Sequence, residues 1–539
     1  MMSISNPILS GFNPDPCICV VGGDFYIATS TFEWFPGVQI HHSKDLKHWR
    51  LITRPLNRIS QLDLRGCRHS GGVWAPSLTY ADGLFWLVYT NVRSLGGPFI
   101  TDSPIFLVTT ENIEGEWSEP VYLGANGFDP SLFHDGNGKK YLLNMQMGDL
   151  GGKRFDGITL QEYDHGKKKF AGDRIRIWDG TELGKTEGPH LYKKDGFYYL
   201  LTAEGGTSYD HAVSMARSKN LLGPYETDPA NPMLTSANRP EVSLKSSGHG
   251  DLFQTPDGEW YMVHLCQRPL QKRGVPEKTW NQDKVAILGR ETALQKVDWP
   301  KGEFPRLKNG GNSPYDEVDE PKLSAHAWED SLRDDFNGPK LNMHFQTLRE
   351  PADESWMSLK RRPGWLSLKG RNSLYSFFEQ SFVARRLQHF KAYVETCLSF
   401  KPLHSKQDAG LIAYYDSQNY HYLRISHAGE GKIRISVVTS DGSPSLEKAD
   451  FSIFEVATID APEKIYLKMS VDYADMNFFW SLDGEDWNRI NKIIDSTNMG
   501  DRCSSISSFT GTFWGICCQD MTGDGIWADF DYFEYHPEI

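Results

Sequence analysis

One phrase occurs five times in the N-terminal part of this sequence. Each copy joins two apolar segments through a tight turn, a pattern typical of a β-hairpin, as in residues 185–201, Lys-Thr-Glu-Gly-Pro-His-Leu-Tyr-Lys-Lys-Asp-Gly-Phe-Tyr-Tyr-Leu-Leu. Aligned on single positions, the copies are 60, 54, 59 and 62 residues apart, and these positions are Pro16, Pro76, Pro130, Pro189 and Asp251. A repeat of this length, with about four strands per unit, is typical of β-propeller blades. We therefore expect five blades in residues 1–310.

The rest of the chain has a different pattern, which predicts a second domain. A chain of 539 residues is longer than one hydrophobic core usually supports. Residues 311–324 are rich in Gly, Pro, Asn, Asp and Glu, and we interpret them as a linker. From 325 to 539, short alternating segments such as 393–400 and 410–415 are separated by Asp, Gly and Asn turns. This pattern favours a β-sandwich, so the predicted fold class is all-β, a five-bladed β-propeller followed by a sandwich.

The charge and hydropathy of the sequence restrict the classes of binding partner and the cellular compartment that we expect. The net charge is −13, from 57 basic and 70 acidic residues, and no stripe of Lys and Arg is interleaved with aromatic residues, so nucleic acid is excluded as an expected partner. Residues 1–7 lack the apolar run of a signal peptide, and no later segment approaches the roughly 20 apolar residues that span a bilayer. We expect no membrane partner and a cytoplasmic location. The eight cysteines form no Cys-x-x-Cys pair, which favours buried thiols over disulfides or a zinc site.

Equivalent positions of a propeller repeat converge on the central axis, because the first strand of each blade lines that axis. The residues directly before the aligned positions are Asp15, Ala75, Asp129, Gly188 and Gly250. One place earlier stand Pro14, Trp74, Phe128, Glu187 and His249. Three carboxylates, a Trp and a His are therefore predicted to meet at one end of the axis.

Each of these residues also has a purely structural interpretation. An Asp before Pro is often a turn or capping residue. Trp74 is also consistent with a role in core packing. His249 is equally consistent with a core histidine and with a ligand to a metal or a sugar. Three carboxylates in one desolvated pocket repel one another, however, and such clusters persist mainly where function needs them. Paired carboxylates beside a Trp that stacks on sugar rings point to glycoside hydrolysis, with the third raising the pKa of the acid.

Six motifs surround these positions: Asn-Pro-Asp-Pro at 13–16, Trp-Ala-Pro at 74–76, Phe-Asp-Pro-Ser-Leu-Phe at 128–133, Thr-Glu-Gly-Pro-His at 186–190, Gly-His-Gly-Asp-Leu at 248–252 and Leu-Gly-Arg-Glu-Thr at 288–292. With these motifs the chain resembles the β-xylosidases of glycoside hydrolase family 43 over nearly its whole length. The resemblance implies a concanavalin-like form for the second domain. It also implies exo-acting, inverting release of D-xylose from short β-1,4-xylooligosaccharides, with side activity on α-L-arabinofuranosides.

The resemblance also assigns roles to residues. Asp15 is implied to be the general base, Glu187 the general acid, and Asp129 the residue that tunes and orients the acid. The residues implied to line the sugar subsite are Trp74, Phe32, His249, Arg290 and, from the second domain, Phe509. No cofactor and no metal ligand is assigned, but a divalent cation such as Ca²⁺ near His249 stays open beside a simple hydrogen bond to a carboxylate. A homo-oligomer, dimer or tetramer, is expected.

Several alternatives remain beside this interpretation. Invertase-like glycosidases share the two-domain plan, but they carry Asn-Asp-Pro-Asn-Gly and Glu-Cys where this chain has Asn-Pro-Asp-Pro and Glu-Gly-Pro. Within the family, a mainly α-L-arabinofuranosidase activity is the nearer rival, and from another class a non-catalytic sugar-binding propeller is disfavoured by the repulsion of its carboxylates. The aromatic stretch 509–514 is open to two interpretations, a lid over the propeller or the core of the sandwich itself.

Overall fold

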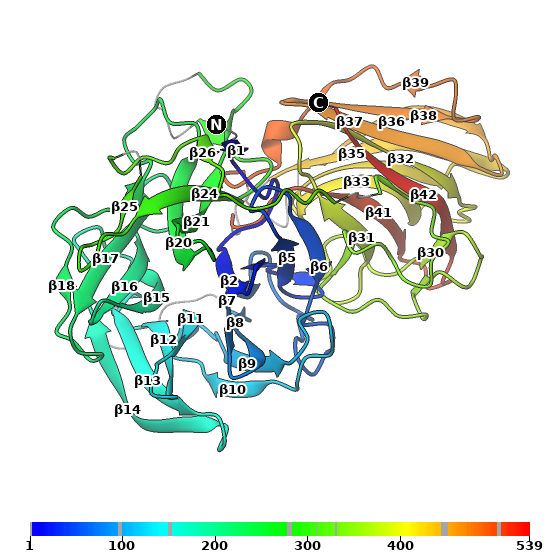
Figure 1. Cartoon of the computed structure of the whole chain (residues 1–539). Coiled ribbons are helices and arrows are strands. Elements are labelled where there is room, and N and C mark those ends of the chain that lie inside the picture. The colour runs from blue at the N-terminus through cyan, green and yellow to red at the C-terminus, as the bar shows by residue number, and fades with distance from the viewer. Residues whose placement is uncertain are drawn as a thin grey trace.

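The computed structural model describes residues 3–94, 100–148, 154–276, 283–308, 310–328, 331–442, 451–503 and 508–538. Within these ranges the chain consists of β-strands, turns and a short 3₁₀ helix, η3 (Ser496–Asn498). Figure 1 shows two bodies, with the first half of the chain in blue to green and the second half in yellow to red. No helix in the described ranges has the length and apolar character needed to cross a membrane.

The first body is a ring of five antiparallel sheets, which confirms the predicted propeller (Figure 1). Blade one holds β2 (Cys17–Val21), β3 (Asp24–Thr29), β5 (Gln39–Ser43) and β6 (Arg50–Thr53). Blade two holds β7 (Gly72–Ala81), β8 (Leu84–Val92), β9 (Ile105–Thr110) and β10 (Val121–Gly124). Blade three holds β11 (Gly127–His134), β12 (Lys140–Gln146), β13 (Ile158–Asp164) and β14 (Lys169–Trp178).

The last two blades complete the ring. Blade four holds β15 (Glu187–Lys194), β16 (Phe197–Glu204), β17 (Ala212–Ser218), β18 (Glu226–Thr227) and β19 (Leu234–Thr235). Blade five holds β20 (Lys245–Gln254), β21 (Trp260–Gln267), β24 (Glu291–Asp298) and β25 (Arg306–Leu307), and its loop carries β22 (Leu270–Gln271) and β23 (Lys284–Val285). Strand β2 contacts both β7 and β20, so the first strands close around one axis. The stretch predicted as a linker contains β26 (Glu317–Asp319), which pairs with β1 (Ser3–Ser5).

The axis-facing position of each blade has an unusual backbone, and it corrects the alignment of the fifth copy. Left-handed φ angles of 54°, 20°, 52°, 54° and 47° occur at Asp15, Ala75, Asp129, Gly188 and His249. In β7, β11, β15 and β20 this residue lies in a register shift against the next strand, which is a β-bulge. Placing Gly250 in this column was therefore wrong by one residue. The fifth copy has Gly250 where the other copies have proline, so aligning it on Asp251 shifted it.

The second body is a sandwich of two antiparallel sheets, as predicted (Figure 1). One sheet contains β27 (Arg333–Asp334), β29 (Met357–Ser358), β30 (Leu366–Lys369), β32 (Lys391–Ser399), β37 (Ile465–Asp472), β38 (Asp475–Ser481), β39 (Asn488–Arg489), β40 (Ile494–Asp495) and β42 (Trp527–Pro537). The other contains β28 (Gln346–Leu348), β31 (Ser381–Arg386), β33 (Gln407–Asp416), β34 (Asn419–His427), β35 (Lys432–Asp441), β36 (Phe451–Asp460) and β41 (Phe513–Asp520). Inward-facing apolar residues such as Leu411, Leu467 and Phe530 form its buried core.

The two bodies are joined by shared structure. Strand β4 (Trp34–Phe35) leaves the first blade and pairs with β28, so a propeller segment extends a sheet of the sandwich. The ring of Trp34 stacks on Phe513 with centroids 3.8 Å apart. Gly289 and Gly511 meet so closely that a Cβ atom on Gly289 would lie 2.8 Å from the Cα of Gly511. The sandwich is therefore fixed against the propeller at the end of the axis where the predicted site lies.

Candidate active site

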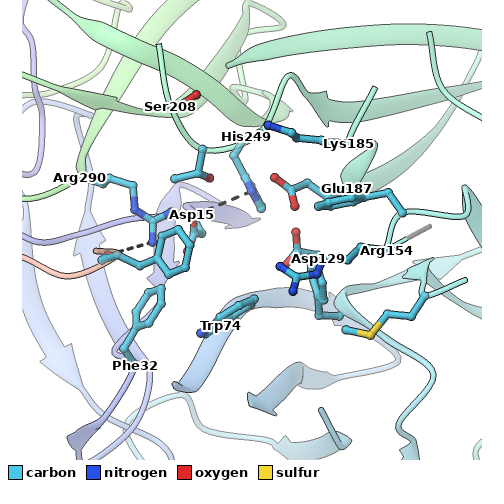
Figure 2. A pocket seen from close by; sticks show the side chains of 16 residues that line it. Asp15, Phe32, Trp74, Asp129, Arg154, Lys185, Glu187, Ser208, His249 and Arg290 are labelled. Carbon is cyan, nitrogen blue, oxygen red and sulfur yellow. Dashed lines mark hydrogen bonds and ion pairs between the residues drawn. The ribbon is translucent and has the colours of Figure 1, made fainter. Parts of the chain in front are cut away.

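A cavity of about 300 Å³ opens at this end of the axis. All eight residues predicted from the sequence line it: Asp15, Phe32, Trp74, Asp129, Glu187, His249, Arg290 and Phe509. Figure 2 shows the carboxyl groups of Asp129 and Glu187 and the ring of His249 pointing into the same space. The three carboxylates are between 5% and 8% exposed, so their charges are largely removed from water.

Asp15 lies directly before β2 and is held as an anion. Arg290 Nη1 donates to its Oδ1 at 2.6 Å, and Ser30 Oγ donates to its Oδ2 at 2.7 Å. His249 Nδ1 lies 3.9 Å from Oδ1, which is too long for a hydrogen bond. Burial acts to raise the pKa of Asp15, but the charge of Arg290 and the bond from Ser30 oppose it, and the pKa lies below its ordinary value. Asp15 is therefore ionised at neutral pH.

The pKa values of Glu187 and Asp129 are raised, whereas that of Asp15 is lowered. Burial raises the pKa of Glu187 to about 8, and the charge of Asp15 adds to the effect. Burial and the charge of Glu187 together raise the pKa of Asp129 well above its ordinary value. The Gly188 amide donates to Asp129 Oδ2 at 3.2 Å, a bond that favours the ionised form of Asp129 and opposes this rise. The site thus holds a protonated carboxyl group and ionised Asp15 at the same pH.

His249 and Glu187 occupy different positions of the repeat, although both line the cavity. Glu187 shares its column with Trp74 and Phe128, whereas His249 shares the column of Asp15. The residue after Glu187 is Gly188, and a Cβ atom there would lie 3.0 Å from the His249 ring. Burial lowers the pKa of His249 to about 4, so its ring is neutral at pH 7.

Aromatic rings form one wall of the cavity. The Trp74 ring lies 6.0 Å from Phe32, 5.3 Å from Phe128 and 5.8 Å from Phe509, measured between centroids. The backbone oxygen of Phe509 accepts a bond from Arg290 Nη2 at 3.1 Å. The second domain therefore contributes a ring to the cavity, while Phe513 and Trp514 further along the same stretch are fully buried.

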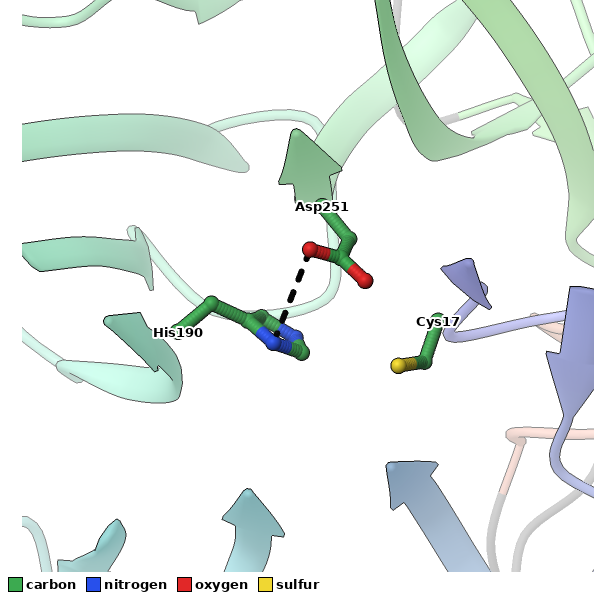
Figure 3. A group of neighbouring side chains, drawn as sticks. All are labelled: Cys17, His190 and Asp251. Carbon is green, nitrogen blue, oxygen red and sulfur yellow. Dashed lines mark ion pairs between the residues drawn. The ribbon is translucent and has the colours of Figure 1, made fainter. Parts of the chain in front are cut away.

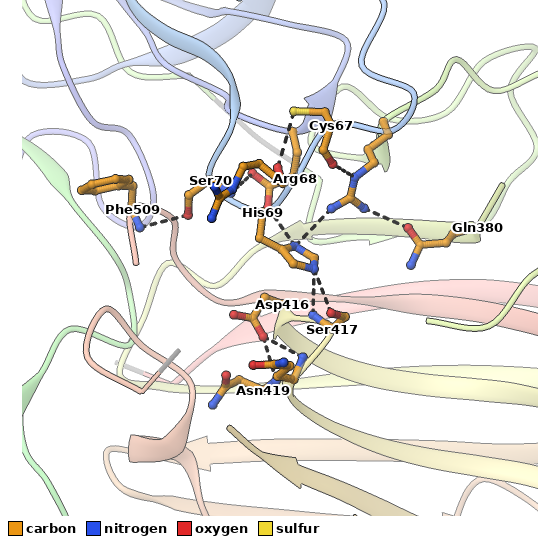
Figure 4. Close-up of polar contacts among 12 residues, drawn as sticks. Cys67, Arg68, His69, Ser70, Gln380, Asp416, Ser417, Asn419 and Phe509 are labelled. Atoms are coloured by element: carbon orange, nitrogen blue, oxygen red, sulfur yellow. Dashed lines mark hydrogen bonds and ion pairs between the residues drawn. The ribbon is translucent and has the colours of Figure 1, made fainter. Parts of the chain in front are cut away.

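Ser70 contacts two residues of the aromatic wall, Trp74 and Phe509, and Figure 4 shows its bond to Phe509. Its backbone oxygen accepts a bond from Trp74 Nε1 at 3.0 Å, and its hydroxyl accepts a bond from the backbone N–H of Phe509 at 3.1 Å. Its own N–H donates to Glu33 Oε2 at 3.1 Å, and its φ of 58° is left-handed. One residue thus sets the position of a ring from each domain.

The loop that carries Ser70 is held by the sandwich (Figure 4). The neighbouring His69 is hydrogen-bonded through Nδ1 to Arg349 Nη2 at 3.1 Å and through Nε2 to Ser417 Oγ at 2.9 Å. Arg349 Nε donates to the backbone oxygen of Cys67 at 2.5 Å. Because His69, Arg349 and Ser417 are at most 1% exposed, this network is rigidly enclosed between the domains.

A second polar group lies one layer deeper on the axis (Figure 3). In the described part of the chain, Cys17, His190 and Asp251 have ligand-type atoms within 4.8 Å of one another. Both Asp251 oxygens are already used, by Tyr192 OH at 2.6 Å and by the N–H of Ile18 at 2.9 Å. Burial also raises the pKa of the Cys17 thiol well above its ordinary value.

These side chains do not fit Ca²⁺, which takes six to eight oxygen ligands. The deeper group offers one carboxylate that is already hydrogen-bonded, with a thiol and an imidazole. Near His249, the closest carboxylate oxygen is Asp15 Oδ1, which is bound to Arg290.

Sequence reasoning missed several residues that line the cavity, among them Phe128, Arg154, Phe155, Lys185 and Ser208. Most lie in loops whose length and sequence differ from blade to blade, so the repeat does not mark them. Phe128 was in the right column but was assigned no role. The signal for Lys185 was its place two residues before Glu187.

Comparisons with known proteins agree with these features. The sequence model described as "Glycosyl hydrolases family 43" matches residues 4–305, and "Beta xylosidase C-terminal Concanavalin A-like domain" matches residues 333–536. Relatives include "Xylan 1,3-beta-xylosidase" of Vibrio sp, 47% identical with 99% of each chain covered, and "Xylosidase/arabinosidase 43B" of Humicola insolens, 43% identical with 100% of this chain and 98% of the other covered. The crystal structure of xylan beta-1,4-xylosidase from Bacillus halodurans C-125 is 47% identical, with a TM-score of 0.93 over 99% of this chain and 100% of that one. The chain therefore belongs to glycosyl hydrolase family 43.

Proposed function

We propose that this chain is an exo-acting, inverting β-xylosidase that releases D-xylose from the non-reducing ends of β-1,4-xylooligosaccharides. The observation that carries the proposal is the opposite protonation of Asp15 and Glu187 in one cavity. The pKa of Asp15 is lowered and that of Glu187 is raised to about 8, which is the arrangement that a general base and a general acid need at neutral pH.

The chemistry follows from these two states. Ionised Asp15 takes a proton from a water molecule as the water oxygen attacks the anomeric carbon of the terminal sugar. The bond from that carbon to the leaving oxygen breaks, and Glu187 gives its proton to the leaving oxygen. Ionised Asp129 keeps the proton on Glu187 until this step, because removing it would place two negative charges side by side.

The exo character is supported by the walls of the cavity. Its volume of about 300 Å³ is at the small end of the range for ligand pockets, which suits a chain end better than a polymer. Phe509 from the second domain and Trp74 from the propeller lie on the same wall. We therefore expect xylotriose to yield xylose and xylobiose, and polymeric xylan to keep its viscosity.

The deciding experiment is ¹H NMR of the xylose first released from 4-nitrophenyl β-D-xyloside, where every xylose formed comes from the cleaved glycosidic bond. Inversion predicts that α-xylose appears first and then mutarotates, whereas β-xylose as the first product would rule out the proposed role of Asp15. The linkage is tested separately by comparing the hydrolysis of β-1,4- and β-1,3-xylobiose, since the named relatives include both a 1,3- and a 1,4-xylosidase. Faster cleavage of the 1,3-linked substrate would change the proposed linkage but not the mechanism.

A second activity, on α-L-arabinofuranosides, is supported by the name of the Humicola insolens relative. The two sugars present similar hydroxyl patterns to the cavity. The 4-nitrophenyl xyloside and arabinofuranoside should therefore both be hydrolysed, with the xyloside preferred by kcat/KM. A preference for the arabinofuranoside would reverse the main and the side activity.

A further inference from the structure

A second cavity of about 300 Å³ lies between the first blade and the sandwich, and no step above uses it. Among the described residues, its lining contains the basic side chains Lys47, Arg54, Arg385 and Arg386 together with three histidines, but no Asp or Glu. The whole chain has a net charge of −13, so this concentration of positive charge runs against the composition. A cavity with charges of one sign and low-dielectric walls focuses the field that they produce.

Part of this charge is neutralised by acidic residues outside the lining. Lys47 Nζ lies 2.5 Å from Glu320 Oε1, and His48 Nδ1 lies 2.7 Å from Asp45 Oδ2. Arg54 and Arg386 differ. Neither has a carboxylate oxygen within 4.0 Å in the described ranges of the chain. Burial lowers the pKa of both guanidinium groups, and the charge of Arg54 further lowers that of Arg386.

The two arginines share neutral partners. Gln39 Oε1 accepts a bond from Arg54 Nη2 at 2.5 Å and another from Arg386 Nη1 at 2.8 Å. Backbone oxygens accept most of the rest, that of Phe345 from Arg54 at 3.2 Å and that of Phe12 from Arg386 at 2.6 Å. Arg54 Nε and Arg386 Nη2 are buried without a partner among the described residues.

This arrangement is energetically costly without a counter-ion. Arg54 is 7% exposed and Arg386 is 5% exposed, and burial lowers the pKa of Arg54 to about 9. Burial and the charge of Arg54 lower the pKa of Arg386 well below its ordinary value. Buried charges in proteins are usually paired, because desolvation is otherwise uncompensated. An anion in the adjacent cavity would supply the missing charge.

We propose that this cavity is a binding site for a compact oxyanion. Arg54 and Arg386 supply the charge, since guanidinium groups suit phosphate and carboxylate oxygens. Trp49 and Trp328 also line the cavity, and the face of an aromatic ring can stack on a sugar ring that carries the anionic group. The oxyanion is either inorganic phosphate or the carboxylate of a sugar acid, and the two are separated by experiment.

The test is isothermal titration of the full-length protein with sodium phosphate, sodium glucuronate and neutral glucose at constant ionic strength. One of the two anions should bind once per chain with a Kd below about 1 mM, and glucose should not bind. Arg386→Met and Arg54→Met should each weaken the binding at least about tenfold, by the loss of a charge-assisted bond. Arg58→Met is the matched control, because Arg58 pairs with the carboxylates of Glu116 and Glu119 at the surface.

Three outcomes would overturn the proposal. The first is the absence of binding by either anion to the wild-type protein, a result that does not depend on whether any variant folds. The second is competitive inhibition of glycoside hydrolysis by the anion in both the wild type and Arg386→Met, which would place the anion in the active site. The third concerns Glu329 and Asp330, which follow Trp328 outside the described residues. Binding that appears only in Glu329→Gln/Asp330→Asn would show that the chain fills the site with its own carboxylate.

Discussion

Two layers of side chains meet on the propeller axis, and they differ in how their polar groups are satisfied. The outer layer contains Asp15, Asp129 and His249 at positions with a left-handed backbone, with Glu187 beside them. The inner layer lies two residues further along each first strand and consists of Cys17, Ser77, Ser131, His190 and Asp251. A small gap on the axis is lined by residues of both layers.

The inner layer is closed by hydrogen bonds. Ser131 Oγ donates to the backbone oxygen of Pro189 at 2.5 Å, Cys17 Sγ lies 3.5 Å from the backbone oxygen of Leu78, and Asp251 accepts two bonds. The outer layer keeps a raised pKa at Glu187 and a strained backbone that costs about 1–3 kcal/mol per residue. The same repeat thus builds a satisfied layer that joins the blades and a strained, charged layer that faces the cavity.

The largest expected effect is at the outer layer, in Glu187→Ala and Asp15→Ala. Loss of the general acid should slow xylobiose hydrolysis by about 10³-fold or more and spare the 2,4-dinitrophenyl xyloside, whose leaving group needs no proton. Loss of the base should slow both substrates alike. Steady-state kinetics on the two substrates checks this. Equal losses on both substrates in Glu187→Ala would remove it from the acid role.

Asp129→Asn should act through the proton on Glu187. Glu187 works as an acid only when protonated, so activity is present below its pKa of about 8 and falls as the pH rises through that value. Removing the neighbouring charge lowers the pKa of Glu187, and the alkaline limb of kcat/KM should therefore move to lower pH. If this pKa falls by one unit, the protonated fraction of Glu187 at pH 8 falls from about one half to about one tenth, so the loss at pH 8 should be about fivefold. A limb that stays in place would mean that Asp129 only orients its neighbour.

The propeller was predictable because hairpin signals recur at nearly constant spacing, and the axis positions of Asp15, Asp129 and Glu187 follow from the repeat. Two features were not predictable from that pattern. The fifth copy has Gly250 in place of proline, so its register depends on a bulge that only the backbone shows. Strand β4 is two residues long and pairs with a strand more than 300 residues away in sequence, which no local periodicity indicates.

The hydrogen bonds between the two domains were equally unpredictable from the sequence. Ser70 has no motif of its own, yet it contacts both Trp74 and Phe509. Arg54 and Arg386 are far apart in sequence and meet only because both reach Gln39. Such contacts depend on how the sandwich docks, and sequence spacing within one domain does not report docking.

Asp251→Asn tests the inner layer and should change stability rather than the pH profile. The amide keeps one acceptor oxygen, so one of the bonds from Ile18 and Tyr192 is lost inside the protein. The free energy of unfolding should fall by about 1–3 kcal/mol, measured by urea denaturation. The alkaline limb of the wild type should be retained. A shifted limb with unchanged stability would show that the inner layer takes part in the chemistry.

Ser70→Ala should have a smaller effect, on substrate binding. The hydroxyl that holds the Phe509 amide is lost, while the backbone bond to Trp74 stays. KM for xylobiose should rise several-fold and kcat should change little, because the aromatic wall binds the ground state and the transition state alike. Ser70→Gly, which also lacks the hydroxyl but suits the left-handed φ of 58°, should raise KM by a similar factor. A fall in kcat with unchanged KM would contradict a positioning role in binding.

The smallest effect is expected from removing divalent cations. Asp15 Oδ1, the carboxylate oxygen nearest His249, is bound by Arg290, both oxygens of Asp251 are hydrogen-bonded, and the pKa of the Cys17 thiol is raised. The ligand atoms beside His249 and around Cys17 are therefore already in use. Prolonged dialysis against EDTA should therefore leave kcat/KM for xylobiose and the thermal midpoint unchanged.

If dialysis does remove activity, adding single metal ions back distinguishes the two layers. Recovery with Ca²⁺ would place an oxygen-bound ion beside His249 in the outer layer, because that ion avoids thiols. Recovery with Zn²⁺ but not Ca²⁺ would instead point to Cys17 and His190, and would turn the inner layer from a hydrogen-bonded joint into a metal site.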